Sequence, residues 1–313
     1  DPPNLPSVNN AGCNPVPTLA NCPRQNVDIA EPGLKLPSVW KANLAFDHEL
    51  PWYGIVAGAE LLLTDVNDGI YFERLDLYNA AGQGPTRYGQ DGRPLFWNAA
   101  GLNPANAGRF GIDPGGAVQT KFNRPNGVGD VMLMRNTSKG KSQQLTVSLE
   151  KPMANDWAWS LAYTYTNADE VSPLTSSQNT SNWGSTLIGT VNENVSTASR
   201  YEIRDRFTGS VNWQHDFFGD NTTSIGLFYE GRSGRPYSYI FFNDANGDSS
   251  GVSQAGYFND LFYVPAGPGD VLWTGGAAME QSFFDWLAEN PDLARYKGQI
   301  APANGFRSKW VNS

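Results

Sequence analysis

Large apolar residues alternate with small or polar residues along several stretches of this chain. In DWAWSLAYTYTNADE, residues 156–170, every second residue is large and apolar: Trp157, Trp159, Leu161, Tyr163 and Tyr165. Successive side chains of a β-strand point to opposite faces, so this period of two predicts a strand with one apolar and one polar face. Such an apolar face can lie against a protein core or against lipid.

The alternating segments form pairs of predicted strands at 39–78, 130–168 and 200–242. A short polar or proline-containing turn joins the two strands of each pair, which predicts antiparallel hairpins. The pattern therefore predicts about six long strands, and residues 307–313 resemble the start of a seventh. The predicted fold class is all-β, with an antiparallel sheet.

Long segments rich in Gly, Asn and Ser separate the hairpins. They cover residues 79–129, 169–199 and 243–306, and residues 1–38 precede the first hairpin. Each is longer than an ordinary connection within a compact domain. Short turns at one end of a sheet and long loops at the other are typical of an outer-membrane β-barrel, in which the long loops are extracellular.

Two folds fit the alternation. In a soluble β-sandwich the apolar face forms the core, whereas in a transmembrane barrel it faces lipid and the polar face lines the interior. The predicted strands are longer than the usual length of about five to six residues, which favours the barrel. Trp52, Tyr53, Trp157 and Phe217 lie near the short turns, where a barrel has its aromatic girdle. We therefore expect residues 1–313 to form part of one barrel domain.

One segment of the last long loop predicts a helix instead of a strand. Within residues 277–296, large apolar residues recur mostly at helical spacing: Met279, Phe283, Phe284, Trp286, Leu287 and Leu293. The polar face of this helix is acidic, so we expect it to pack on neighbouring loops and not on a membrane surface.

The composition excludes one class of partner and one kind of membrane segment. The net charge is −9, and nucleic-acid binding needs a basic surface, so nucleic acid is not an expected partner. No stretch approaches the roughly 18 consecutive apolar residues of a membrane-spanning helix. The only cysteines, Cys13 and Cys22, lie in a Pro- and Asn-rich stretch. In a secreted or periplasm-facing loop so close a pair most simply forms a disulfide, whereas free thiols would indicate a reduced compartment.

Several strings carry more than alternation: KLPSVWKANLAFDHELPW, SLEKPMANDWAWSLAYTYTNADEV, YEGRSGRPYSYIFFNDANGDSSG and GQIAPANGFRSKW. Their order and spacing resemble the β-barrel of TonB-dependent outer-membrane receptors, in particular the OmpA-related, Oar-like group that has an N-terminal carboxypeptidase-regulatory-like domain. The likeness covers most of residues 35–313 and corresponds to the later part of the barrel wall. The chain begins like the interior of a loop and ends like the start of a strand, so we expect it to be a fragment.

The resemblance implies a receptor in the outer membrane of a Gram-negative bacterium. Such a receptor binds a substrate at its extracellular loops and admits it past a plug, with energy relayed by the TonB complex. Its expected partners are outer-membrane lipid, an unidentified extracellular substrate, and the TonB complex through an N-terminal region outside these residues. Two alternatives remain: a secreted soluble β-sandwich that binds glycans, and a passive outer-membrane pore or adhesin.

One loop has the pattern of a calcium site. In NDANGDSSG, residues 243–251, oxygen ligands stand at alternate positions: Asp244, Asn246, Asp248 and Ser250. However, Ser249 stands where the pattern has Gly, and no Glu follows at the twelfth position. An Asn-Gly turn explains the same string without a metal. Calcium is the one candidate ion, and no organic cofactor is expected.

Charged residues gather where the third hairpin leaves the expected membrane, namely Arg204, Arg206, Glu230, Arg232 and Arg235. They form either a lumenal network that contacts substrate or plug, or ordinary cross-strand pairs worth a few tenths of a kcal/mol each. The only histidines, His48 and His215, lie on apolar faces near short turns. Without a third His, and without a Ser or Cys in a catalytic motif, nucleophilic or zinc catalysis has no support, and we expect no enzyme activity.

Overall fold

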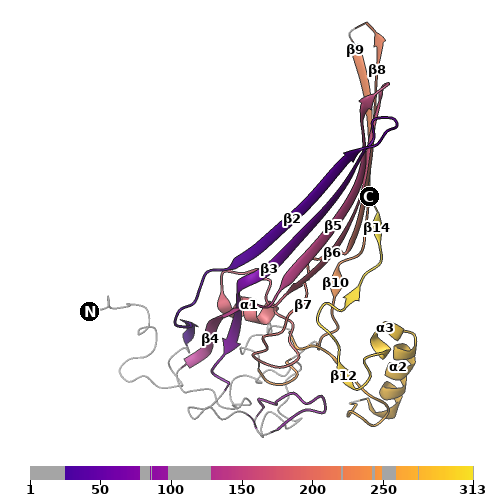
Figure 1. Cartoon of the computed structure of the whole chain (residues 1–313). Coiled ribbons are helices and arrows are strands. Elements are labelled where there is room, and N and C mark those ends of the chain that lie inside the picture. The colour runs from indigo at the N-terminus through magenta and orange to yellow at the C-terminus, as the bar shows by residue number, and fades with distance from the viewer. Residues whose placement is uncertain are drawn as a thin grey trace.

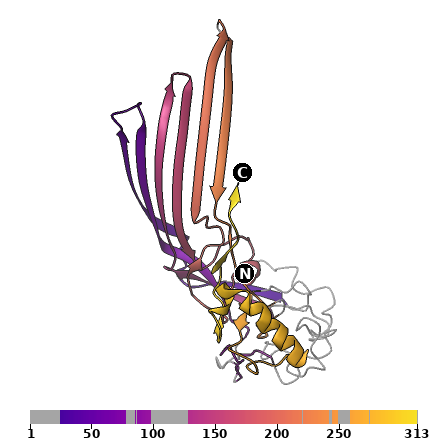
Figure 2. The same cartoon turned by 90° about the vertical axis from the view of Figure 1, so that its right-hand side faces the viewer.

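The computed structural model describes residues 25–77, 85, 87–97, 128–219, 221–241, 244–248, 259–273 and 275–312. Its main feature is a single curved sheet of long strands that rises from a layer of loops and short helices (Figures 1 and 2). The long strands are β2 (Ser38–Glu49), β3 (Val56–Arg74), β4 (Val128–Thr137), β5 (Lys141–Ala154), β6 (Trp157–Glu170), β8 (Asp205–Phe218) and β9 (Asn221–Arg232). The chain is therefore mostly β, as the alternation predicts.

Shorter elements lie in the loop layer and at the edges of the sheet. The short strands are β1 (Gln25–Ala30), β7 (Thr197–Ala198), β10 (Pro236–Tyr237), β11 (Tyr263–Val264), β12 (Gln299–Ile300), β13 (Phe306–Arg307) and β14 (Val311–Asn312). The helices are α1 (Asn179–Ser185), α2 (Gly276–Ala288) and α3 (Pro291–Ala294). None of these helices, nor any other described part of the chain, offers a helical segment long and apolar enough to cross a membrane.

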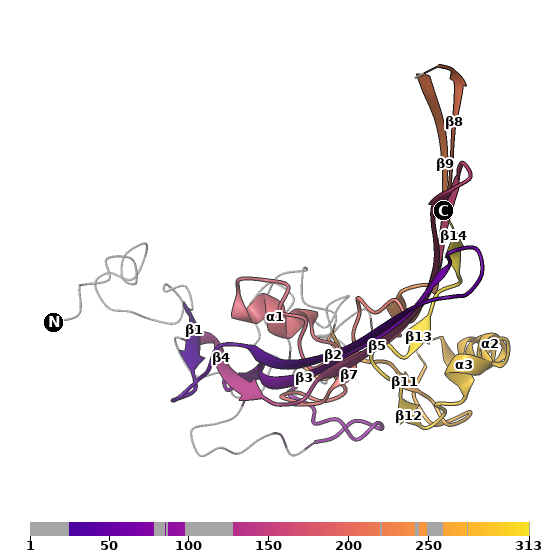
Figure 3. The ribbon, with the colours of Figure 1, turned by 45° about the horizontal axis from the view of Figure 1, so that its top comes forward.

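The large sheet is antiparallel except for the pair β1–β4, and it is open at its edges. Its hairpins β2–β3, β5–β6 and β8–β9 stand side by side, and β3 also pairs antiparallel with β5, as β6 does with β8 (Figure 2). Among the described strands, β2 pairs only with β3, and β14 pairs only with β9. The sheet also bends along its strands (Figure 3). The predicted antiparallel sheet is confirmed, whereas closure into a barrel is not observed.

The predicted strand at 130–150 is interrupted at residues 138–140, and its two parts are β4 and β5. Both parts pair with β3 in the same register, so they act as one long strand with a break. At Gly140 φ is 127°, and a Cβ there would lie 3.0 Å from Val66 Cγ2. Only glycine fits this conformation and this close approach, which explains the break.

Three other boundaries differ from the prediction. Residues 25–30, expected within a loop, form β1 and pair in parallel with β4. The turn expected at 151–155 is shorter, because β5 continues to Ala154 and only Asn155 and Asp156 have positive φ values, 53° and 68°. Two such residues form the tight turn whose twist matches a hairpin.

The third hairpin also ends earlier than predicted. Strand β9 ends at Arg232, and Pro236 begins the separate strand β10, which pairs with β13. A proline lacks the N–H that a continuous ladder requires, which accounts for a separate short strand. Strand β14 pairs with β9 where residues 307–313 were expected to start a new strand.

Cross-strand pairing gathers the apolar residues on one face of the sheet. Leu61 lies opposite Leu44 and Leu145, and Leu145 lies opposite Tyr165. Two residues further along β5, Val147 lies opposite Tyr163, and Tyr163 lies opposite Phe207. Directly opposed residues of antiparallel strands project to the same side. A continuous apolar face therefore runs from β2 to β9.

The opposite face of the same strands is polar. Its cross-strand contacts include Asn43 Nδ2 donating to Glu60 Oε1 at 2.8 Å, and the Ser160 and Ser210 hydroxyls at 2.8 Å. Along β5, residues of this face are less exposed than their apolar neighbours: Gln144, Thr146 and Ser148 are half-buried. By contrast, the intervening Leu145, Val147 and Leu149 are 45%, 44% and 39% exposed.

The buried cores lie in the loop layer and at the ends of β3 and β4 that join it. One core joins the ends of β3 and β4 to α1 and nearby loops, and contains Phe72, Leu77, Phe96, Met132, Trp183, Ile188 and Val191. The other packs α2 and α3 against the segment around β12 and β13, and contains Val264, Leu287, Leu293, Ala301 and Phe306. The predicted helix at 277–296 is thus present and packs on neighbouring loops. It is split before Pro291, which suits the first turn of a new helix.

Candidate functional site

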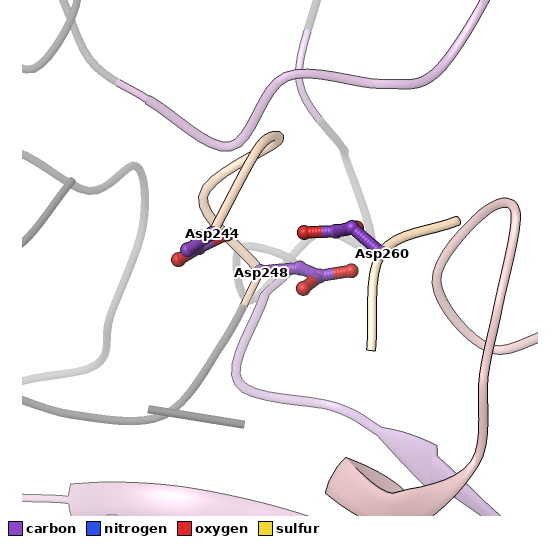
Figure 4. Close-up of side chains that lie close together, drawn as sticks. All are labelled: Asp244, Asp248 and Asp260. Atoms are coloured by element: carbon purple, nitrogen blue, oxygen red, sulfur yellow. The ribbon is translucent and has the colours of Figure 1, made fainter. Parts of the chain in front are cut away.

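Three buried aspartates meet in the loop layer. Asp244 and Asp248 belong to the segment 244–248, and Asp260 lies where the chain forms a parallel bridge with Ile188. One carboxylate oxygen from each residue lies within 4.8 Å of the other two. In the view of Figure 4, Asp248 lies between Asp244 and Asp260.

The loop 244–248 is held in shape by its own side chains. The Gly247 N–H donates to Asp244 Oδ1 at 2.7 Å, and Asn246 Nδ2 donates to Asp248 Oδ2 at 3.0 Å. Gly247 has a φ of 85°, and a Cβ there would lie 2.9 Å from Trp97. Glycine is therefore required where the loop passes against the segment around Trp97.

Two buried arginines flank the aspartates. Arg93 Nη1 pairs with Asp260 Oδ1 at 3.3 Å, and Arg74 Nη1 donates to the Asp248 carbonyl at 2.5 Å. Burial raises the pKa of Asp260 well above its ordinary value, and the neighbouring charges of Asp248 and Asp244 raise it further. The Ala245 N–H and Arg93 oppose this increase in the pKa. Negative charge is thus costly in this cluster.

This arrangement can hold either shared protons or a hard cation. Carboxylate and amide oxygens are the ligands that Ca²⁺ prefers, and the sequence pattern identifies Asp244, Asn246 and Asp248 among them. The structure brings Asp260 to the same place, which the pattern did not predict. Ser250, the remaining predicted ligand, lies outside the described residues. Calcium binding stays a prediction, and the following pH and calcium experiment tests it.

We expect Ca²⁺ to raise the melting temperature of the protein at pH 7.5 and to do so less as the pH falls. A carboxyl with a raised pKa takes up a proton on folding, so the unfolding free energy falls as pH rises from the unfolded value of 3.8 to the raised folded value. A bound cation opposes this loss only while the carboxylates are ionised. Scanning calorimetry with Ca²⁺ or with chelator, across this pH range, measures the effect.

The matched pair of variants for this experiment is Asp260→Asn and Asp285→Asn. Asp285 is exposed on α2, where its Oδ1 accepts from Gln281 at 2.8 Å, so its replacement should leave the calcium effect unchanged. Asp260→Asn should remove most of the calcium effect and flatten the pH dependence. An equal calcium shift in wild type and Asp260→Asn would contradict the prediction.

The predicted arginine cluster is divided into separate contacts. Arg206 Nε pairs with Glu230 Oε1 at 3.0 Å on the polar face of β8 and β9. Arg204 Nε pairs at 3.2 Å with Glu202 Oε1, and Glu202 also pairs with Arg307 of β13. Glu202 is 3% exposed. No local sequence pattern predicts its pair with Arg307, because the two residues are far apart along the chain.

Arg232 and Arg235 do not join these pairs. Arg232 lies opposite Arg206 across the β8–β9 ladder, and Arg235 is exposed. Within the part of the chain that the structure describes, neither guanidinium forms an ion pair. A single network of all five predicted residues is therefore not present, and whether any of them contacts a substrate stays a prediction.

The remaining candidates lie at the turn end of the sheet or outside the described residues. His215 stacks on Trp213 with a centroid distance of 5.8 Å, and its Nδ1 lies 2.8 Å from Asp156 Oδ2. His48 stacks on Phe46 at 6.2 Å. Both imidazole rings stack on aromatic residues, as expected for histidines on the apolar face of the sheet. Cys13 and Cys22 lie outside the described residues.

No protein-family model, curated protein or solved structure matches this chain.

Proposed function

We propose that this chain forms part of the wall of a transmembrane β-barrel in the outer membrane of a Gram-negative bacterium. The observation that carries the proposal is the uneven exposure of the two faces of β5. Along β5, the apolar side chains are the exposed ones and the polar side chains between them are half-buried. Water would favour the reverse arrangement, whereas a hydrocarbon solvent favours this one.

The position of the buried cores supports the same reading over a soluble sandwich. A sandwich buries its apolar face beneath a second sheet at a spacing of about 10 Å. Here the described core residues lie in the loop layer and at the adjoining ends of β3 and β4, and no described element covers the apolar face of β5 and β6. Trp52, Tyr53 and Phe218, near the short turns, are 55%, 82% and 79% exposed, which is suitable for an aromatic girdle at the membrane interface.

Within this class, we propose a TonB-dependent receptor that binds and takes up an extracellular substrate. The support is the resemblance of the ordered strings between residues 35 and 313 to the Oar-like group, together with the large loop layer at one end of the sheet. A passive pore or adhesin has the same wall but no energy coupling. The site residues and the identity of the substrate do not enter this proposal.

The receptor proposal is tested by the coding sequence upstream of Asp1 and by the location of the complete product. A plug domain and a TonB box upstream, with the product in the outer-membrane fraction, are the expected results. An outer-membrane product without a plug and TonB box would favour the pore or adhesin. A soluble monomer would favour the secreted sandwich.

A further inference from the structure

A cavity of about 310 Å³ lies in the loop layer. None of the three aspartates lines it, although Leu261, which follows Asp260, does. Four separate parts of the chain enclose it: the end of β6 with the residues that follow, the segment 186–200, Leu261, and residues 300–304. Its walls are mainly apolar, formed by Val171, Leu187, Ile188, Leu261, Ile300 and Ala301. Apolar walls with a few polar groups are typical of small-molecule sites.

Three charged side chains line the cavity, but they are not equivalent. Glu193 is occupied by its own loop, since its carboxylate accepts the N–H of Gly189 at 3.1 Å and both the N–H and the hydroxyl of Thr190. Glu170 Oε1 accepts from the Ser199 hydroxyl at 2.9 Å and from the Arg200 N–H at 3.3 Å. The Arg200 guanidinium donates to the Ser185 carbonyl. Glu170 and Arg200 are therefore the charged groups with capacity left for a ligand.

Glu170 and Arg200 do not neutralise each other. Their side chains form no ion pair with each other in the described structure, although the Arg200 backbone contacts the Glu170 carboxylate. Both are half-buried, and both line the same apolar cavity. A ligand with only one charge would pair with either Glu170 or Arg200. The other side chain would then face a ligand group that is apolar or has the same sign of charge. A ligand with both charges satisfies both.

We propose that this cavity binds a small zwitterion with an apolar side chain, of the size of a hydrophobic amino acid or a short peptide end. The ligand ammonium would lie against Glu170, its carboxylate against Arg200, and its side chain against the apolar wall. The volume is at the lower end of the range for ligand pockets, which roughly runs from 300 to 1,000 Å³, so a small ligand is expected. This inference goes beyond the proposed function and does not depend on it, because the loop layer would present the cavity in a membrane protein or in a soluble one.

The experiment compares three probes that differ only in charge: leucine, isovalerate without the ammonium, and isopentylamine without the carboxylate. Binding to the purified protein in detergent micelles is measured by ligand-observed NMR and calorimetry. Leucine should bind, and each analogue should bind at least about tenfold more weakly, because a lost charge-assisted hydrogen bond is worth roughly that factor. Equal binding of leucine and either analogue, or undetectable binding of leucine, would overturn the proposal.

Variants locate the binding in this cavity. Arg200→Gln should weaken leucine binding by about tenfold or more and leave isopentylamine binding unchanged, which a general loss of loop structure would not do. Val195→Trp should block the cavity, and because Val195 lines it and is 51% exposed, the larger ring does not overpack a core. Arg295→Gln, an exposed arginine outside the cavity lining, is the control and should bind as wild type. Unchanged leucine affinity in both Arg200→Gln and Val195→Trp would also overturn the proposal.

Discussion

Replacing Val147 with arginine should prevent this sheet from inserting into a bilayer. Val147 lies near the middle of β5, on the apolar face, opposite Ala59 and Tyr163. If this face contacts lipid, an arginine there places a charge in hydrocarbon, at a cost of about 2–4 kcal/mol near the midplane. We expect a large drop in the fraction of protein that folds into liposomes, measured with urea titration of tryptophan fluorescence.

The control is Thr146→Arg, one residue away on the polar face. Thr146 lies opposite Glu60 and Thr164, so a guanidinium there meets a carboxylate and hydroxyl groups. This variant should insert about as well as wild type. If both variants insert equally, or if Val147→Arg yields a more soluble and equally folded monomer, the apolar face does not contact lipid.

Replacing Arg74 with methionine should cost the most stability of any single change in the loop layer. Arg74 is fully buried and binds Asp76 through two bonds, Nε to Oδ1 at 3.0 Å and Nη2 to Oδ2 at 2.7 Å. It also contacts Asp130 and lies over the Trp183 ring at 5.4 Å. Removing the cation from buried acids costs about 3–5 kcal/mol, because their charge stays in a low-dielectric site.

The measurement is the free energy of unfolding in detergent micelles, with hydrogen exchange as a local readout. The Val131 N–H donates to Asp76 Oδ1 at 3.0 Å, so its protection should fall in Arg74→Met. Arg206→Met is the control, since the Arg206 side chain is 48% exposed and its pair with Glu230 should contribute at most about 1 kcal/mol. If both variants lose the same free energy of unfolding, the buried Arg74 cluster does not stabilise the loop layer more than an exposed ion pair does.

Alternation predicts the strands and their faces well, because a period of two follows from local backbone geometry. Along β6, Trp157, Leu161, Tyr163 and Tyr165 are exposed and the small or polar residues between them are half-buried, whereas Trp159 is half-buried and breaks this alternation. Interruptions are harder to predict. The break at Gly140 depends on its contact with Val66 of a neighbouring strand, and a local pattern contains no such contact.

The candidate site shows the same limit. The spacing of Asp244, Asn246 and Asp248 is a local signal, and these residues do meet in one loop. Asp260 joins them only because the segment 259–261 pairs with residues around Ile188 and Ile240. A buried arginine such as Arg74 has no local signature either, since a charged residue near the end of a strand usually indicates a solvent-exposed position.

Lipid contact by the apolar face is tested most directly by a scan of single positions along β5. Single cysteines at consecutive positions from 144 to 149, on a Cys13→Ser and Cys22→Ser background, would carry an environment-sensitive fluorophore in reconstituted liposomes. Quenchers attached to the lipid chains and quenchers dissolved in water then report the surroundings of each position.

Lipid contact by the apolar face predicts quenching by lipid at 145, 147 and 149 and quenching by the aqueous agent at 144, 146 and 148, in strict alternation. Fluorescence that responds to the aqueous quencher at all six positions, or to neither quencher at 145, 147 and 149, would contradict it.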